Sequence, residues 1–300
     1  MSVQKIKQQS KEWLDITSPT KADRAYLEKK CDFEEVDIAY AFAKTLRTKI
    51  TPRQGYTFLV TLVPSYNKEK ESIELHEVDI FLTPTQLITI HQQPITALVD
   101  LHAELKSNIP ARRALFNNGT KHVLFMVMET LLEHTDDMID TLNDELESLK
   151  KDIFSGTHGT QMVNATLNMR HSVTEMRKAV RGFLTILTHI HTQKNLEYFE
   201  GLHDYASELW DNLESHKELI EALEDANETI IAHNLNGVLR LLTMFSAVLL
   251  PASVTAGIFG MNAKNMPLVG HSIDFWLMLA GVVGSSLVVL LVFAYKRLIR

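Results

Sequence analysis

The sequence contains a single cysteine, Cys31, among its 300 residues. One thiol cannot form a disulfide within the chain, and such sparse use of cysteine suits a reducing compartment. Excess positive charge is also lacking, because the formal net charge is −7 and the pI is near 6.0. A surface that binds nucleic-acid phosphates is expected to be basic, so we predict no nucleic-acid partner.

Common catalytic motifs are absent as well. The sequence contains no HExxH, no GxSxG, no P-loop and no CxxC, so we expect neither an enzyme nor a catalytic cofactor. The first residues, MSVQKIKQQSKEWLDI, contain no apolar h-region, and no cleavable signal peptide is therefore expected.

Charged side chains are missing from two long runs near the C-terminus. The runs are residues 241–260, LLTMFSAVLLPASVTAGIFG, and residues 275–295, FWLMLAGVVGSSLVVLLVFAY. About 20 residues at 1.5 Å each cross a hydrocarbon core of ~30 Å, and neither run offers the charged face of a soluble helix. The mean hydropathy of −0.04 therefore averages two unlike regions, and we predict two transmembrane helices.

The charges that flank these runs predict the orientation. Lys296, Arg297 and Arg300 follow the second run and Arg240 precedes the first, whereas the loop between the runs carries only Lys264 as a firm positive charge. The positive-inside rule then places both termini in the cytoplasm and the loop outside. We expect a multi-pass protein of the cell membrane (inner or plasma membrane), in contact with membrane lipid.

The remainder of the chain predicts a cytosolic α+β domain followed by long helices. Residues 55–64 and 74–91 are rich in β-branched and aromatic residues and are typical of strands, while residues 33–47 and 95–105 indicate helices. A glycine-containing break, SGTHGT at 155–160, separates two long helical patterns and predicts an antiparallel hairpin. The expected organisation is an α+β domain at 1–115, a helical hairpin at 116–195, a stalk helix that becomes the first transmembrane helix at 196–260, an external loop at 261–274, the second transmembrane helix at 275–295, and a basic tail at 296–300.

The stalk helix carries a coiled-coil pattern. An apolar seam with 4–3 spacing comprises Leu202, Ala206, Leu209, Leu213, His216, Ile220, Leu223, Asn227 and Ile230. His216 and Asn227 are interpreted as residues that fix the register, with metal binding at His216 as a minor alternative. Two transmembrane helices cannot enclose a water-filled path, so an ion path would require several copies and a stalk helix that self-associates.

Acidic residues recur every seven positions outside the seam. One stripe comprises Glu197, Asp204, Asp211, Glu218 and Asp225, and the other Glu200, Glu214, Glu221 and Glu228. They are either a collector that concentrates cations near a pore or an ordinary solvated face.

Small and polar residues share one face of the first transmembrane run and the turns before it. They are Asn236, Thr243, Leu250, Ser253, Gly257 and Gly260, at steps of three, four or seven. Such residues either line an aqueous path or promote close helix packing, and the spacing alone leaves both interpretations open.

The segment PASVTAGIFGMN, from Pro251 to Asn262, resembles the signature of CorA-type divalent-cation transporters. In that family a proline-containing transmembrane helix ends in Gly-Met-Asn, and a short external loop leads to a second helix near the C-terminus. The resemblance extends over the chain: an α+β cytosolic domain, a helical hairpin, a stalk, two spans and a basic tail.

This resemblance implies a homopentameric funnel with the first span around a central pore. Gly260, Met261 and Asn262 would form the outer selectivity ring, whose amide and carbonyl oxygens accept hydrogen bonds from the waters of a hydrated Mg²⁺. Glycine at 260 would let the backbone turn. Asn236, Thr243, Leu250, Ser253 and Gly257 match pore-lining positions of the family, and Lys296, Arg297 and Arg300 resemble its inner basic collar.

The sequence departs from the family pattern in two places. The family often has an aromatic after the Asn and later Met-Pro-Glu, whereas Ala263 follows Asn262 and Leu268 follows Pro267 here. At the positions of the family's regulatory aspartates stand Gly201 and Tyr40. No regulatory metal is therefore assigned, with Asp204 as a weak candidate.

Three functions follow from the sequence. The first is a channel or transporter for Mg²⁺, with Co²⁺ or Ni²⁺ as further ions. The second is a zinc transporter of the same family, with or without proton coupling. The third, of another class, is a membrane-anchored oligomeric scaffold without transport.

Overall fold

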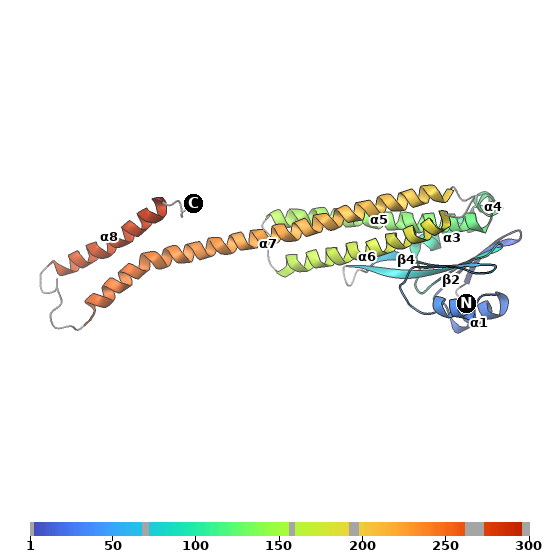
Figure 1. The fold of residues 1–300 in the computed structure, drawn as a ribbon, viewed down its shortest axis with the longest axis horizontal. Coiled ribbons are helices and arrows are strands. Elements are labelled where there is room, and N and C mark those ends of the chain that lie inside the picture. Colours follow the sequence, from blue (N-terminus) through green and yellow to red (C-terminus); the bar gives the residue numbers. More distant parts are fainter. Residues whose placement is uncertain (1–2, 68–71, 156–159, 192–197, 262–272, 296–300) are drawn as a thin grey trace. The chain divides into compact units, whose positions relative to one another are not determined.

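The computed structural model describes residues 3–67, 72–155, 160–191, 198–261 and 273–295. Contacts divide the chain into two compact units, Met1–Glu224 and Asp225–Arg300. The predicted α+β domain and helical hairpin therefore share one packed body. Figure 1 labels the elements that follow.

A six-stranded sheet forms the centre of the first unit. Its strand order is β1-β2-β6-β5-β4-β3, and β2 and β6 are the parallel pair, whereas the other neighbours are antiparallel. The strands are β1 (Val3–Gln8), β2 (Lys11–Thr17), β3 (Lys49–Pro52), β4 (Thr57–Asn67), β5 (Ser72–Leu82) and β6 (Gln86–His91). Alternation of side chains between the two faces lets each face bury a separate hydrophobic layer.

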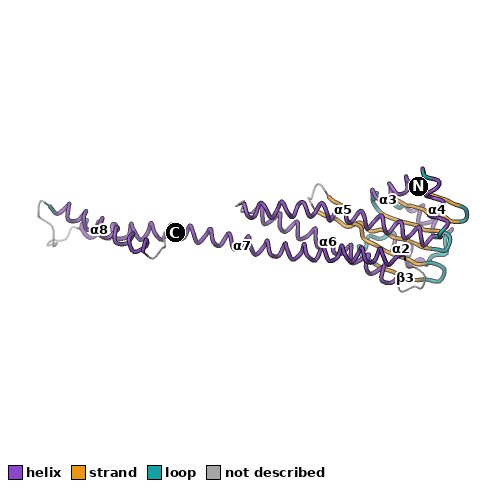
Figure 2. Tube along the Cα trace, turned by 90° about the horizontal axis from the view of Figure 1, so that it is seen from above, coloured by secondary structure: helices purple, strands orange, loops and turns teal. Residues whose placement is uncertain are grey.

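Two short helices, α1 (Lys21–Lys30) and α2 (Glu35–Ala41), cover one face of the sheet (Figures 1 and 2). Leu27 and Ile38 of these helices join a cluster with Phe58, Phe81 and Ile88 from the strands. A capping box at Thr20 begins α1: the Thr20 hydroxyl accepts from the Asp23 amide, and Asp23 accepts from the Thr20 amide. This cap satisfies donors that a helix start otherwise leaves unpaired.

Four further helices follow β6. They are α3 (Thr96–Ser107), α4 (Ile109–Asn117), α5 (Thr120–Ser155) and α6 (Thr160–His191). Helix α6 packs on β4 and β5, and α3 contacts both β1 and α5. The long helices thus lie on the face opposite α1 and α2 (Figure 1). Their apolar side chains at helical spacing, such as Leu131, Met176 and Phe183, are fully buried.

Helix α7 (Tyr198–Phe259) contributes to both units, and its α-helix continues through Pro251. In the first unit it lies beside α5 and α6 (Figures 1 and 2). Tyr205 donates a hydrogen bond to Asp136 of α5, and Arg177 of α6 pairs with Glu214. Helix α7 is therefore held by ion pairs and hydrogen bonds to its own chain's hairpin.

The seam of α7 is a packing face within the chain. Its members from Leu202 to Leu223 are all buried in the single chain. This stretch of the seam packs against the chain's own helices, and self-association of the stalk stays a prediction. A 4–3 spacing indicates that a helix face packs against another helix, but it does not indicate whether that helix belongs to the same chain or to another copy.

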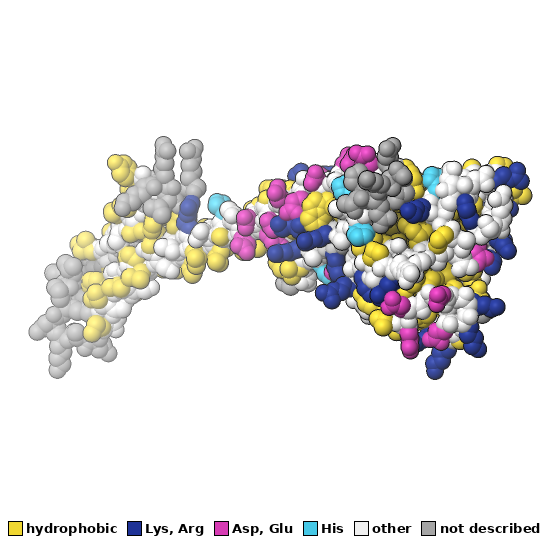
Figure 3. Space-filling model, turned by 45° about the vertical axis from the view of Figure 1, so that its right-hand side comes forward, with side chains coloured by type: hydrophobic (Ala, Val, Ile, Leu, Met, Phe, Trp, Pro, Cys, Tyr) yellow, Lys and Arg dark blue, Asp and Glu magenta, His cyan; other side chains and the backbone are white. Residues whose placement is uncertain are grey.

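Helix α8 (Asp274–Tyr295) belongs to the second unit with the end of α7. Both α7 and the segment Phe275–Phe293 are long and apolar enough to cross a membrane. In the space-filling view, hydrophobic and uncharged side chains dominate the described surface of the second unit, whereas charged side chains gather on the first unit (Figure 3). This contrast is the one expected between a lipid-facing and a water-facing surface.

The predicted helix at 33–47 is too long, because α2 ends at Ala41. The Glu77 carboxylate of β5 accepts hydrogen bonds from the backbone N–H groups of Thr45 and Leu46. Leu46 has φ 50°, a left-handed conformation that no helix continues through. A tertiary contact thus ends the helix where local propensity would extend it.

Candidate functional site

In the second unit, α8 covers one side of α7. The Ser286 hydroxyl of α8 donates to the Val248 carbonyl at 3.2 Å. Ala256 of α7 and Phe275, Met278 and Leu279 of α8 share a small hollow of about 110 Å³. The opposite side of α7 has no such cover among the described residues.

This opposite side, which we call the uncovered face, carries the residues predicted to line a pore. Its exposed members are Thr243, Ser246, Leu250, Ser253 and Gly257. Ser246 was missed by the sequence interpretation, although it completes a 3–4–3–4 spacing from Thr243 to Gly257. Asn236, also exposed, lies two turns earlier on α7. The predicted residues within the described part of α7 therefore do lie on one side of a helix.

The hydroxyls of the uncovered face bond back to their own helix. Thr243 donates to the Leu239 carbonyl at 2.8 Å, Ser246 to Leu242 at 2.9 Å and Ser253 to Leu249 at 3.0 Å. Each hydroxyl donates its only hydrogen to this bond, so the lone pairs on its oxygen remain available to accept hydrogen bonds. The face therefore presents hydrogen-bond acceptors, and waters bound to a cation are donors.

Helix α7 ends at the predicted selectivity segment. The Gly260 amide donates to the Ala256 carbonyl at 2.9 Å, and the Met261 amide donates to Ile258 at 3.3 Å. Gly260 does not adopt a left-handed φ. A Cβ there would lie 3.0 Å from the Ala256 carbonyl oxygen, closer than normal packing. Glycine is favoured at 260 by this close approach.

Several predicted site residues fall outside the described residues. They are Asn262 of the selectivity segment and Lys296, Arg297 and Arg300 of the basic tail. Met261 is described, and its side chain is 64% exposed.

Comparison with known proteins identifies the family to which this architecture belongs. The family model described as CorA-like Mg²⁺ transporter protein matches residues 8–297. The chain belongs to this family. Its members are transporters, which confirms the expectation that the chain is not an enzyme. Membership also agrees with the two apolar C-terminal helices, which membrane transporters of this family have.

Relatives and a solved structure support the assignment over nearly the full chain. The "Cobalt/magnesium transport protein CorA" of Methanocaldococcus jannaschii is 23% identical over 290 residues, or 94% of this chain and 88% of the relative. The protein of the same name from Thermotoga maritima is 20% identical over 84% of this chain and 72% of the relative. The complete CorA structure from M. jannaschii superposes with a TM-score of 0.82 at 20% identity, covering 96% of this chain and 92% of the other.

The positions at which CorA-type proteins were expected to have regulatory aspartates are structurally ordinary here. Tyr40 of α2 is half-buried, with its ring edge-on to Phe58 at 5.9 Å and the Lys49 ammonium 4.7 Å from its centre. Gly201 is exposed, and a Cβ would meet nothing within 4 Å. Both positions hold a residue without a carboxylate.

Asp204 has few titratable neighbours among the described residues of the single chain. Its exposed carboxylate lies 3.7 Å from Nδ1 of His203. Among the residues that the structure describes, no three His, Cys, Asp or Glu side chains lie together as metal ligands would. Of the acidic stripes, Glu214 pairs with both Arg177 and Lys217, while Asp211 and Glu218 are exposed.

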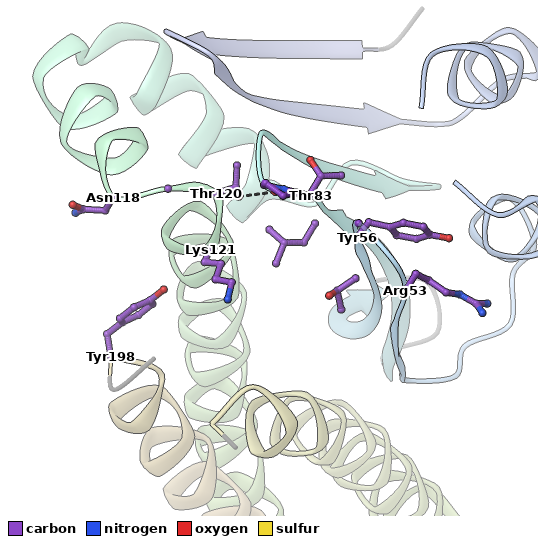
Figure 4. A pocket seen from close by; sticks show the side chains of 12 residues that line it. Arg53, Tyr56, Thr83, Asn118, Thr120, Lys121 and Tyr198 are labelled. Carbon is purple, nitrogen blue, oxygen red and sulfur yellow. Dashed lines mark hydrogen bonds between the residues drawn. The ribbon is translucent and has the colours of Figure 1, made fainter. Parts of the chain in front are cut away.

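A hollow of the first unit lies away from these residues. It measures about 690 Å³ and lies between the β3–β4 turn, the β5–β6 turn and the starts of α5 and α7. Lys121 and Tyr198 line one side (Figure 4). Arg53 and Tyr56 line the other, but their polar tips point away from Lys121 (Figure 4) because both hydrogen-bond Asp37. The guanidinium of Arg53 and the hydroxyl of Tyr56 are therefore engaged with Asp37.

Proposed function

We propose that this chain transports divalent cations, Mg²⁺ first, through a pore that a homopentamer builds around α7. The observation that carries the proposal is the uncovered face, where three hydroxyl oxygens and Gly257 lead along α7 to Gly260 and Met261. Polar groups directed to lipid are costly, so such a face belongs against water or another helix.

The chemistry of the face suits a hydrated ion. Mg²⁺ loses its waters reluctantly, and a row of neutral oxygen acceptors can bind those waters without holding the ion too tightly to leave. Leu250, 62% exposed in the single chain, would form a hydrophobic constriction between the hydroxyls. Asn262 and the carbonyls of Gly260 and Met261 would form the outer ring, and Lys296, Arg297 and Arg300 the inner collar.

The driving force for entry needs no ATP site. A membrane potential of 100 mV favours inward movement of a doubly charged ion by about 4.6 kcal/mol. With the orientation set by the positive-inside rule, both termini lie in the cytoplasm of a cell whose plasma or inner membrane holds the protein.

Flux into proteoliposomes tests the proposal. Purified protein is reconstituted with an internal ion indicator, and Mg²⁺, Co²⁺, Ni²⁺ and Zn²⁺ are added in turn, with and without a pH gradient. The proposal expects Mg²⁺ flux that grows with an inside-negative potential. Zinc flux that depends on the pH gradient would favour the zinc transporter, and no divalent flux under any condition would favour the scaffold.

A further inference from the structure

Two carboxyl side chains of β5 lie next to each other in the interior of the first unit. Glu77 and Asp79 are two residues apart, so they share a face of the strand. Glu77 is 6% and Asp79 3% exposed. Phe81, two residues further along the same face, belongs to the hydrophobic cluster that packs against α1 and α2. Two negative charges in such a place would be strongly unfavourable.

Glu77 is held by the segment that follows α2. It accepts hydrogen bonds from the Thr45 amide at 3.1 Å, the Thr45 hydroxyl at 3.0 Å and the Leu46 amide. Hydrogen bonds to an ionised carboxylate are stronger than neutral ones. They bridge 31 or 32 residues of sequence and keep Leu46 in its left-handed conformation.

Asp79 differs from Glu77 in its hydrogen bonding. Its Oδ1 is buried and has no hydrogen-bond partner in the described part of the chain. Burial, together with the neighbouring Glu77 carboxylate, raises the pKa of Asp79 well above its usual value. Asp79 also lines a small enclosed cavity of about 30 Å³ with Glu77, Lys44 and His91, a volume that a water molecule can occupy.

We propose that Glu77 and Asp79 form a proton-linked latch, which holds residues 43–48 while one proton is shared by the two carboxyl groups and releases them when that proton is lost. The proton leaves an Asp79 oxygen for water. Two carboxylates then remain side by side, and their repulsion is relieved by moving Glu77 away from Thr45 and Leu46.

The other charged groups nearby do not neutralise the pair. Lys49 lowers the pKa of Asp79, but its ammonium is 3.5 Å from the Asp37 carboxylate, so its charge is shared. Burial, helped by Lys44, lowers the pKa of His76, so that ring stays neutral near pH 7. His91 is paired with Asp15 at 3.0 Å. Lys44 is exposed to solvent, which screens its charge.

Release of the latch would alter a contact between residues 43–48 and helix α6 of the hairpin. Thr48, at the end of the held segment, contacts Gly182 of α6 so closely that a Cβ at 182 would overlap the Thr48 hydroxyl. The latch therefore links the protonation state of the sheet interior to the contact between the sheet edge and α6.

Hydrogen–deuterium exchange of the full-length protein in detergent micelles tests the proposal. Protection factors for the amides of residues 43–48 are measured from pH 6 to pH 9 after correction for intrinsic exchange. We expect protection to fall at least tenfold across this range in the wild type. Protection that stays constant with pH would overturn the proposal.

Two variants sharpen this experiment. Asp79→Asn keeps a donor of the same shape but cannot ionise, so its protection should remain high at pH 9. Glu77→Gln removes the charged acceptor and should lower protection at every pH. A parallel loss of protection in Asp79→Asn and the wild type would contradict the latch. Exchange of β4 amides, which lie outside the segment, reports whether each variant is folded.

Discussion

Asp37 connects the second helix to the edge of the sheet. Its buried carboxylate accepts hydrogen bonds from Arg53 at 2.8 and 3.1 Å and from the Tyr56 hydroxyl at 2.9 Å, with Lys49 3.5 Å away. Burial alone would raise the pKa of Asp37, but the hydrogen bonds from Arg53 and Tyr56 outweigh it and the pKa is lowered. Asp37 therefore stabilises the fold in its ionised form.

Replacing Asp37 tests this residue. Asp37→Asn should lower the free energy of unfolding by about 2 kcal/mol at pH 7, less than for a fully buried pair, because Arg53 is 27% exposed. A lowered pKa gives stability that is present above the unfolded value near 4 and is lost as the pH falls through the folded value. The difference between wild type and variant, measured by thermal unfolding in detergent, should therefore shrink below about pH 4.

Glu34 supplies the matched control. It contacts the same Arg53 at 3.2 Å, but its side chain is 54% exposed, so Glu34→Gln should cost well under 1 kcal/mol. Equal losses for the two variants would show that Asp37 is not the specific partner described above.

At the scale of elements, α7 contains a buried polar residue in its seam. His216 is 6% exposed, its Nδ1 has no hydrogen-bond partner among the described residues, and burial lowers its pKa. A buried ring that must stay neutral gives stability that is present above the unfolded pKa of about 6.5 and is lost as the pH falls through the folded value.

We predict that His216→Leu stabilises the protein, because an apolar side chain replaces a buried polar atom without a partner. The gain over wild type should grow by up to about 1.4 kcal/mol per pH unit below pH 6.5. Melting temperatures at pH 7.5 and 5.5 measure it. His171→Leu, on the exposed side of α6, should show no such growth, and a pH-independent gain at 216 would contradict the account.

The end of α7 offers a comparison between two threonines. Thr243 lies on the uncovered face, whereas Thr255 is half-buried on the side of α8, and both bond back to their own helix. Thr243→Val removes an acceptor for the waters of the ion and should lower Mg²⁺ flux about tenfold, or about 1.4 kcal/mol. Thr255→Val should leave flux within about twofold of wild type. The reverse order would mean that the uncovered face is a packing surface and not a path.

Long periodic elements were predictable from sequence, and elements held by distant contacts were not. The strand predicted at 55–64, which corresponds to β4, and the helices α5 to α8 were anticipated because each repeats its pattern over many residues. Strands β1 and β2 were missed. Ile6 is the one fully buried side chain of β1. In β2, the charged residue Asp15 suggests an exposed position in the sequence, but it is buried and hydrogen-bonded to Thr89 and His91.

The candidate site was predictable to a similar extent. Spacing alone placed Thr243, Leu250, Ser253 and Gly257 on one face, and the same spacing contained Ser246. It could not tell the exposed Thr243 from the half-buried Thr255, because that difference depends on where α8 packs. Likewise, the 4–3 seam could not reveal that the chain's own hairpin covers it.

The whole molecule must take one orientation in the membrane for residues 261–274 to form the outer mouth. The single native thiol, Cys31, allows a Cys31→Ser background for accessibility labelling. In intact cells a membrane-impermeant maleimide should label Lys264→Cys in the loop but not Ser2→Cys near the N-terminus. Permeabilised cells should label both. Labelling of position 2 in intact cells would reverse the orientation and with it the assignment of the outer ring.

Two asparagines of the external segment distinguish the proposed selectivity ring from the rest of the loop. Asn262 follows Gly260 and Met261 in the proposed selectivity ring, and Asn265 lies three residues later in the same loop. Mg²⁺ flux into proteoliposomes is measured for Asn262→Ala and Asn265→Ala, with equal protein incorporation. We predict that flux falls to background for Asn262→Ala and stays near wild type for Asn265→Ala. Undiminished Mg²⁺ flux in Asn262→Ala would contradict it.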